Sequence, residues 1–222
     1  MADQLTYLFG GDRPWTQDLW TASDDRVRGG SSISHLTVRD PPSQAIFHGN
    51  LDTKTLGGAG FASQRTKGVL SLDLSRTVGL QLDLAAGNSE QTFTLTVKDT
   101  IPERREDGRD EAGVSWEVDF EAPADGGVIV KKWHEFRATY RGRDIDDPKP
   151  LDLGDVKRIS LMMRSFFDQQ DGDFKLVVNS IAAVNKTCDG DDSDHEDLRK
   201  PAVRRDETEA RPWWKMLFCG LL

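Results

Sequence analysis

Cysteine is scarce in this sequence, and its two cysteines, Cys188 and Cys219, lie outside the region that the sequence pattern predicts to be folded. Neither a structural disulfide nor a thiolate zinc site is therefore expected, and a reducing compartment fits this usage. Long apolar runs are missing as well. No stretch approaches the roughly 18 apolar residues that a membrane-spanning helix requires.

An excess of basic charge is also lacking, since the formal net charge is -9. No basic stripe follows the chain as it does in proteins that track a phosphate backbone, so nucleic acid is not an expected partner. The first eleven residues contain Asp3 but no arginine, which appears only at Arg13. They predict neither a secretory signal nor an arginine-rich mitochondrial transit peptide.

The patterns that usually announce a reaction centre are absent too. The histidines show no close helical spacing and no cysteine cluster accompanies them; they are His35, His48, His134 and His195. The glycine-rich stretches 28–32 and 56–61 do not match a phosphate-binding loop, and neither leads into an amphipathic helix. The sequence therefore predicts no metal, no cofactor and no catalytic residue, and favours a protein that is not an enzyme.

Short runs in which apolar residues alternate with polar ones are abundant, and this pattern is typical of half-buried strands. The clearest is 91–99, in which Phe93, Leu95 and Val97 share one face. The other predicted strands are 45–51, 69–74, 78–84, 114–120, 131–140, 156–163 and 174–184. Turn-forming clusters that contain glycine, proline, asparagine or aspartate separate these runs.

Helical periodicity over three turns occurs nowhere in the first 185 residues, which disfavours a parallel α/β architecture. The fold class predicted is all-β, an antiparallel β-sandwich of the jelly-roll kind. We expect one domain over residues 1–185 and, over 186–222, a disordered charged tail, acidic at first, with an apolar, aromatic end. The charged segment 101–113 is expected to form a solvated loop between two strands.

Two features near the start allow more than one interpretation. Asp24 and Asp25 could contribute to a calcium site, but two carboxylates supply too few oxygen ligands, so a solvated loop is the preferred interpretation. Trp15 and Trp20 could stack on a sugar ring, as exposed tryptophans do in carbohydrate-binding sandwiches. Packing against the first strands is the commoner fate of such large apolar groups.

Several motifs, in order, resemble the complex I intermediate-associated protein 30 family. The segment 20–25, Trp-Thr-Ala-Ser-Asp-Asp, with Gly-Gly-Ser-Ser at 29–32, is similar to the family's entry motif. Phe-His-Gly-Asn-Leu at 47–51 and Gly-Gly-Ala-Gly-Phe-Ala-Ser-Gln-Arg at 57–65 resemble its next two motifs, with Ala59 where members often carry glycine. Trp-His-Glu-Phe at 133–136, Tyr-Arg-Gly-Arg at 140–143 and the closing strand at 172–181 complete a match over roughly residues 15–185.

This resemblance implies a galactose-binding-like jelly roll and a role in assembling mitochondrial complex I (NADH dehydrogenase), without established catalytic residues. It implies protein partners, namely complex I subunits and other assembly factors, and a mitochondrial location. Loops 24–32 and 57–65 would recognise these partners at one end of the sandwich. The candidate binding residues are Trp20, Asp24, Asp25, Gly29, Gly30, Ser31, Gly58, Gly60, Phe61, Arg65 and Arg141. A carbohydrate-binding module is an alternative.

The final residues, Cys219-Gly220-Leu221-Leu222, fit the Cys-a-a-X pattern for prenylation, although Gly220 is an imperfect aliphatic position. Aromatic and basic residues just upstream could add peripheral membrane contact, because one lipid chain needs a second signal for stable anchoring. An apolar tail that docks on protein is the equal alternative. The sequence is thus also compatible with a cytoplasmic paralogue that acts as an interaction module anchored through Cys219.

Overall fold

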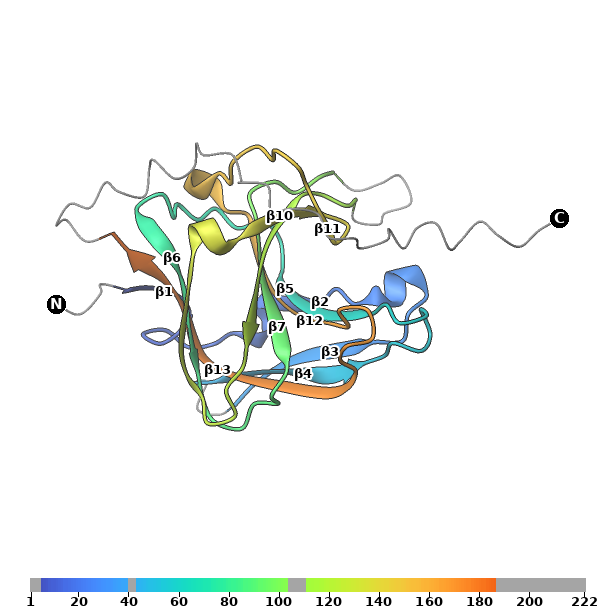
Figure 1. Cartoon of the computed structure of the whole chain (residues 1–222). Helices are drawn as coiled ribbons and strands as arrows, with labels where there is room; N and C mark the ends of the chain where they lie inside the picture. Colours follow the sequence, from blue (N-terminus) through green and yellow to red (C-terminus); the bar gives the residue numbers. More distant parts are fainter. Residues whose placement is uncertain (1–4, 40–42, 104–110, 187–222) are drawn as a thin grey trace, which may run out of the picture. The chain divides into compact units, whose positions relative to one another are not determined.

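The structure is a computed structural model that describes residues 5–39, 43–103 and 111–186. Its strands form two antiparallel sheets that face each other (Figure 1). Sheet A has the order β3-β4-β13-β6-β9, with β1 also paired to β13. Its strands are β1 (Leu5–Gly10), β3 (Ile33–Val38), β4 (Ala45–Leu51), β6 (Thr77–Leu84), β9 (Gly127–Lys132) and β13 (Gly172–Asn185).

Sheet B has the order β11-β10-β8-β7-β12-β5-β2. Its strands are β2 (Trp20–Ala22), β5 (Phe61–Thr66), β7 (Thr92–Lys98), β8 (Ser115–Glu121), β10 (Arg137–Tyr140), β11 (Arg143–Asp144) and β12 (Arg158–Arg164). Short 3-10 helices lie in the connections: η1 (Gln17–Leu19), η2 (Asp25–Arg28), η3 (Trp133–Glu135) and η4 (Leu153–Asp155). The predicted all-β antiparallel sandwich is confirmed.

The core between the two sheets is formed by the inward-facing side chains of the strands, which alternate with outward-facing ones. On β7, Phe93, Leu95 and Val97 are all fully buried, as the sequence pattern predicts. Phe93 packs between Phe47 of β4 and Phe120 of β8, with ring centroids 6.1 Å apart in both pairs. Aromatic rings from both sheets therefore fill the centre, and such contacts contribute about 0.5–1.5 kcal/mol beyond the area they bury.

The long strand β13 organises sheet A (Figure 1). Its first half, from Gly172 to Val178, pairs with β4 on one side, and its second half, from Ser180 to Val184, pairs with β1 on the same side. Strand β6 lies along the other side of its second half. This one strand therefore joins the beginning of the chain to its middle.

The predicted strand at 69–74 is wrong, because Leu72 forms only an isolated bridge to Val156. Leu70, Leu72 and Leu74 of this segment pack on the core from an irregular connection instead. The predicted strand at 131–140 divides at η3 into the end of β9 and all of β10. Among the described residues no helix is long and apolar enough to cross a membrane.

Candidate functional site

The connection between β2 and β3 carries the acidic pair Asp24 and Asp25, and both side chains are buried, at 7% and 0% exposure. The solvated-loop interpretation is therefore wrong. A buried carboxylate is tolerated only when it is paired or its oxygens accept hydrogen bonds. Both aspartates meet this condition with partners that lie far along the chain.

Asp25 joins the two sheets. Its Oδ1 accepts a hydrogen bond from the backbone N–H of Ser32 (3.1 Å), and its Oδ2 accepts from the Ser32 hydroxyl (2.7 Å). Oδ2 also accepts from the backbone N–H of Phe61 (3.1 Å), the first residue of β5 in sheet B. Since Ser32 directly precedes β3 in sheet A, one carboxylate holds the ends of two strands from opposite sheets.

Asp24 repeats this arrangement one step further along the same strands. It accepts hydrogen bonds from the backbone N–H of Ser34 (3.1 Å) and from the Ser34 hydroxyl (2.6 Å) on β3. It also accepts from the backbone N–H of Ser63 (2.9 Å) on β5. The two aspartates thus close one edge of the sandwich, where β3 of sheet A approaches β5 of sheet B.

The glycines of the matching motifs make room for these contacts. A Cβ on Gly30 would lie 2.3 Å from the Asp25 carboxylate, and one on Gly60 would lie 2.4 Å from the Asp52 carbonyl oxygen. Gly29 and Gly58 instead have positive φ angles of 84° and 93°, which favour glycine. Close packing against Asp25 and Asp52 therefore explains the need for glycine at positions 30 and 60.

A third loop, between β12 and β13, meets the other two at this end of the sandwich. The backbone N–H of Ser165 donates to the Gly60 carbonyl (3.0 Å), and Asp168 lies against Gly58. Loops 24–32 and 52–60 are joined in turn by the Thr55 and Ser31 hydroxyls, 3.1 Å apart. We call these three connections, residues 24–32, 52–60 and 165–171, the loop end.

The 165–171 connection contains three consecutive residues in the left-handed region. Phe166, Phe167 and Asp168 have φ angles of 45°, 58° and 68°. A left-handed helical conformation costs roughly 1–2 kcal/mol per residue for L-amino acids. The turn is closed by a hydrogen bond from the Gln169 N–H to the Ser165 carbonyl (2.9 Å), so this conformation is held by the surrounding structure.

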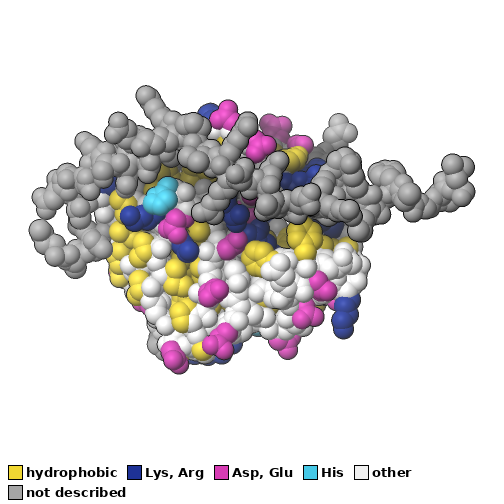
Figure 2. All heavy atoms as spheres, viewed as in Figure 1, with side chains coloured by type: hydrophobic (Ala, Val, Ile, Leu, Met, Phe, Trp, Pro, Cys, Tyr) yellow, Lys and Arg dark blue, Asp and Glu magenta, His cyan; other side chains and the backbone are white. Residues whose placement is uncertain are grey.

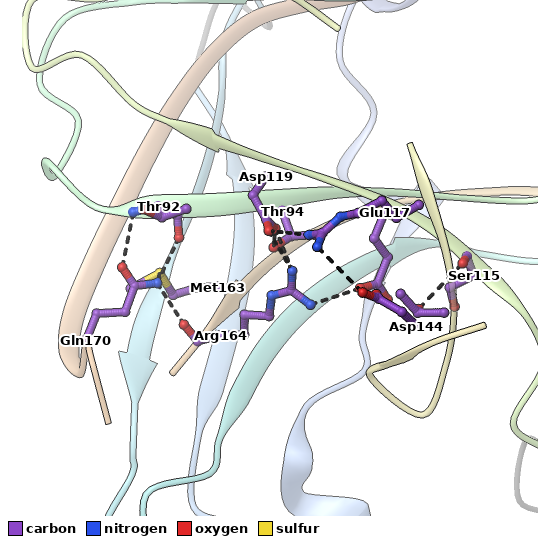
Figure 3. A network of polar contacts seen from close by, with 11 residues as sticks. Thr92, Thr94, Ser115, Glu117, Asp119, Asp144, Met163, Arg164 and Gln170 are labelled. Carbon is purple, nitrogen blue, oxygen red and sulfur yellow. Dashed lines mark hydrogen bonds and ion pairs between the residues drawn. The ribbon is translucent and has the colours of Figure 1, made fainter. Parts of the chain in front are cut away.

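Gln170 fixes the turn to sheet B through its side-chain amide (Figure 3). Its Oε1 accepts from the backbone N–H of Thr92 (3.1 Å), while its Nε2 donates to the Thr92 carbonyl (2.8 Å). Nε2 also lies 2.7 Å from the Arg164 carbonyl oxygen. The amide therefore takes the place that a neighbouring strand would occupy beside Thr92.

Arg164 links the loop end to the outer face of sheet B, the side that points away from the core (Figure 3). Its Nη1 lies 2.9 Å from Glu117 Oε2, and its Nη2 lies 2.6 Å from Asp119 Oδ1. Arg137 also contacts Asp119, at 3.0 Å. Glu117 is only 6% exposed, so this pairing stabilises a carboxylate that would otherwise be buried alone.

Aromatic rings and guanidinium groups alternate along the same edge. The Arg28 guanidinium lies 5.5 Å from the Phe61 ring, and that of Arg164 lies 4.7 Å from the Phe166 ring. Phe61 and Arg164 face each other across the pairing of β5 with β12. Beyond Phe166, Phe167 extends outward with 81% of its surface exposed.

The remaining candidate residues lie elsewhere. Trp20 is buried at 4% exposure and packs with Trp15 and Phe9 in the core, so neither tryptophan can stack on a sugar. Arg65 lies on the outer face of sheet B, opposite Ser160 of β12. Arg141 follows β10, near the edge of sheet B away from β2 and β5. Cys219 lies outside the described residues.

The histidines form no reaction centre with acid and nucleophile in the part of the chain that the structure describes. His35 and His48 are neighbours on the outer face of sheet A, with ring centroids 5.5 Å apart. Partial burial and the charge of His35 lower the pKa of His48. Within residues 5–39, 43–103 and 111–186, no group of three or more histidine, cysteine or acidic side chains is placed to hold a metal ion.

Sequence patterns did not indicate Arg164, Gln170 or Phe167. Two of these residues act through partners that are distant in sequence: Glu117 is 47 positions from Arg164, and Thr92 is 78 positions from Gln170. The sequence offered one signal for this site, the adjacent Phe166 and Phe167 among polar residues, because two large apolar side chains are uncommon in a solvated turn.

The fold is that of the β-sandwich carbohydrate-binding modules. A family 11 carbohydrate-binding module from a cellulosomal cellulase of Clostridium thermocellum superposes with a TM-score of 0.53 and 16% identity, covering 84% of this chain and 97% of the module. The same module in complex with a β-1,3-1,4-mixed-linked tetrasaccharide gives a TM-score of 0.52 at 14% identity, covering 75% and 89%. At this identity the similarity shows the fold alone.

The sequence identifies the family. Residues 8–178 match complex I intermediate-associated protein 30 (CIA30), and the chain belongs to this family. An uncharacterized protein of Schizosaccharomyces pombe, C9E9.15, is 42% identical over 188 residues, which cover 82% of this chain and 85% of the relative. The resemblance seen in the sequence motifs is therefore confirmed.

Proposed function

We propose that this protein is a non-enzymatic binding protein of the assembly-factor type, which recognises protein partners through the loop end. By its family, those partners are subunits of mitochondrial complex I and other assembly factors. The observation that carries the proposal is the fixed presentation of Phe167, an aromatic side chain held outward on a strained turn. Strained backbone conformations are concentrated at functional sites, and aromatic anchors dominate protein interfaces.

The contacts described above make the loop end rigid. Asp25 fixes the first loop to the second, the Ser165 N–H fixes the third to Gly60, and Gln170 fixes the third to β7. A surface that is rigid before binding loses less conformational entropy when it binds. The rigidity of the loop end therefore supports a role for these loops in recognising a partner.

The charges beside Phe167 suggest the chemistry of the partner. Asp168 and Asp171 belong to the same loop, and residues 165–171 contain no lysine or arginine. The surface that fits is an apolar pocket with basic side chains at its rim, because complementary charge at a rim speeds association and favours the correct partner.

Co-purification from respiring cells tests the proposal. Untagged protein, recovered with an antibody, should bring down complex I subunits or assembly factors, and Phe167→Ala should reduce their yield at least tenfold. Val69→Ala is the matched control, since Val69 is 62% exposed but lies outside the loop end. Recovery of no complex I component, with complex I levels intact after deletion of the gene, would refute the proposal.

Carbohydrate binding is the second candidate, because the fold resembles modules of which one was solved with a tetrasaccharide. The tryptophans that suggested it from the sequence are buried, so that support is removed. A glycan array that includes mixed-linked glucans decides the matter. Binding to any glycan above background would favour this candidate over protein recognition.

A further inference from the structure

The outer face of sheet A carries a pair of histidines that the proposed function does not use. His35 of β3 and His48 of β4 are register partners in the antiparallel pairing of these strands. Both side chains line an open groove on this face, together with Asn50 and Asp173. The groove runs across three strands, β3, β4 and β13, so its floor is rigid backbone.

The imidazole rings are close and available. Their centroids are 5.5 Å apart and their planes are inclined by 35°. Neither ring has a hydrogen-bond partner among the described residues, in contrast to the neighbouring Asn50, whose Nδ2 donates to Asp173 Oδ1 (2.8 Å). Four ring nitrogens therefore lie at an open groove with their hydrogen-bonding capacity unused.

The surrounding charges do not oppose a cation between the rings. Lys175 is the register partner of His48 on β13, but its Nζ lies 3.4 Å from the position of a Cβ on Gly87. Gly87 belongs to the segment that runs along β13 on the side away from β4, as the hydrogen bond from the Ser89 N–H to the Lys175 carbonyl shows. Lys175 lines the groove together with Asp173, but its ammonium group reaches toward Gly87, on the side of β13 away from the histidines.

We propose that His35 and His48 form a two-imidazole chelate for a divalent transition-metal ion such as Cu²⁺, Ni²⁺ or Zn²⁺. Metal–nitrogen distances of about 2.0–2.1 Å place each ring centroid about 3.2 Å from the ion, so two rings at a tetrahedral angle have centroids about 5 Å apart. The observed centroid separation of 5.5 Å is close to that value. The fixed strand register holds the two nitrogen ligands in place before the ion arrives.

The donor set determines which ions fit. Imidazole suits copper, nickel and zinc, whereas Mg²⁺ and Ca²⁺ require oxygen ligands. The described residues supply two ligands and no third, which leaves coordination positions for water or for a ligand from another molecule. The site is therefore an open one, and its affinity should be greatest for Cu²⁺, as expected for nitrogen ligands.

Titration of the metal-free full chain with CuCl2, NiCl2 or ZnCl2 tests this inference. The protein is prepared without a histidine tag and with Cys188→Ser, Cys219→Ser and His195→Ala, so that the tail offers no competing thiol or imidazole. Calorimetry should show one ion per chain, tightest for Cu²⁺, and Zn²⁺ should shift the imidazole resonances of His35 and His48 together. MgCl2 should shift neither.

Variants assign the binding to this pair. His35→Gln and His48→Gln should each weaken Cu²⁺ binding at least tenfold, whereas His134→Gln should leave it unchanged. Heat denaturation monitored by circular dichroism confirms that each variant is folded, and added Zn²⁺ should raise Tm in the parent protein only. Unchanged Cu²⁺ affinity in both variants, or Zn²⁺ shifts confined to His134, would overturn the proposal.

Discussion

Removal of the Asp25 carboxylate should destabilise the fold strongly, because this side chain is fully buried and accepts three hydrogen bonds. In Asp25→Ala the backbone N–H groups of Ser32 and Phe61 lose their acceptor. Each unsatisfied buried donor costs about 1–3 kcal/mol. With entry of water offsetting part of this cost, we expect the free energy of unfolding to fall by about 3–4 kcal/mol, a large part of the 5–15 kcal/mol typical of a domain.

Urea denaturation followed by tryptophan fluorescence measures this loss. For an m-value of about 2 kcal/mol/M, the midpoint should fall by roughly 1.5–2 M. Asp25→Asn, which retains one acceptor oxygen, should give an intermediate shift. Asp12→Ala is the surface control, since the Asp12 side chain is 62% exposed and pairs with Arg13 at 3.5 Å. A loss below about 1 kcal/mol in Asp25→Ala would show that the hydrogen bonds from Asp25 to Ser32 and Phe61 are not needed to hold β3 and β5 together.

Three further predictions follow from other contacts. Arg164→Ala leaves the 6% exposed Glu117 without its partner and should lower the free energy of unfolding by about 2–3 kcal/mol in urea denaturation; an unchanged midpoint would contradict the pairing. Hydrogen bonds from Ser75 lower the pKa of Asp73 from its ordinary value of 3.8. The ionised Asp73 therefore stabilises the fold above pH 3.8, and this stabilisation is lost as the pH falls through the lower pKa of the folded state. Asp73→Asn should therefore show a shallower loss of stability than the wild type below pH 4, and parallel curves would refute this. Finally, we propose that Cys219 is prenylated, as its Cys-a-a-X pattern predicts, so that Cys219→Ser removes the prenyl mass increment and lowers membrane association in cell fractionation. An unmodified Cys219 with equal soluble fractions in both proteins would exclude the lipid anchor and leave docking on protein as the better account.

The strands of the core were predictable because their alternation reflects one buried face. Strand β4 begins and ends at the predicted residues, and β7 differs by one residue at each end. Strand β5, which lies next to the edge strand β2, was missed because its inward residues include the polar Gln64 and Thr66, so no apolar alternation is visible in its sequence. The segment 69–74 was wrongly predicted as a strand because its leucines alternate with polar residues, and such leucines can also anchor an irregular connection to the core.

The site was less predictable than the fold. An acidic pair beside two arginines has the composition of a solvated loop, and only its distant partners Ser34 and Ser63, 10 and 39 positions from Asp24, bury it. The left-handed turn at Phe166 contains no glycine, the residue that usually indicates a positive φ angle. Such features depend on contacts between strands that meet only after folding, so local sequence patterns cannot indicate them.

The position of β13 has a consequence for synthesis of the protein on the ribosome. This strand is the last element of the described fold, yet it is the partner of β1, β4 and β6. Until Asn185 has been translated and released, sheet A has no centre, and the apolar face of β4 and β6 that carries Phe47 and Leu82 stays exposed. The nascent chain must therefore wait, unfolded and open to aggregation, for almost its whole domain to emerge, which makes it a natural client of chaperones during its own production.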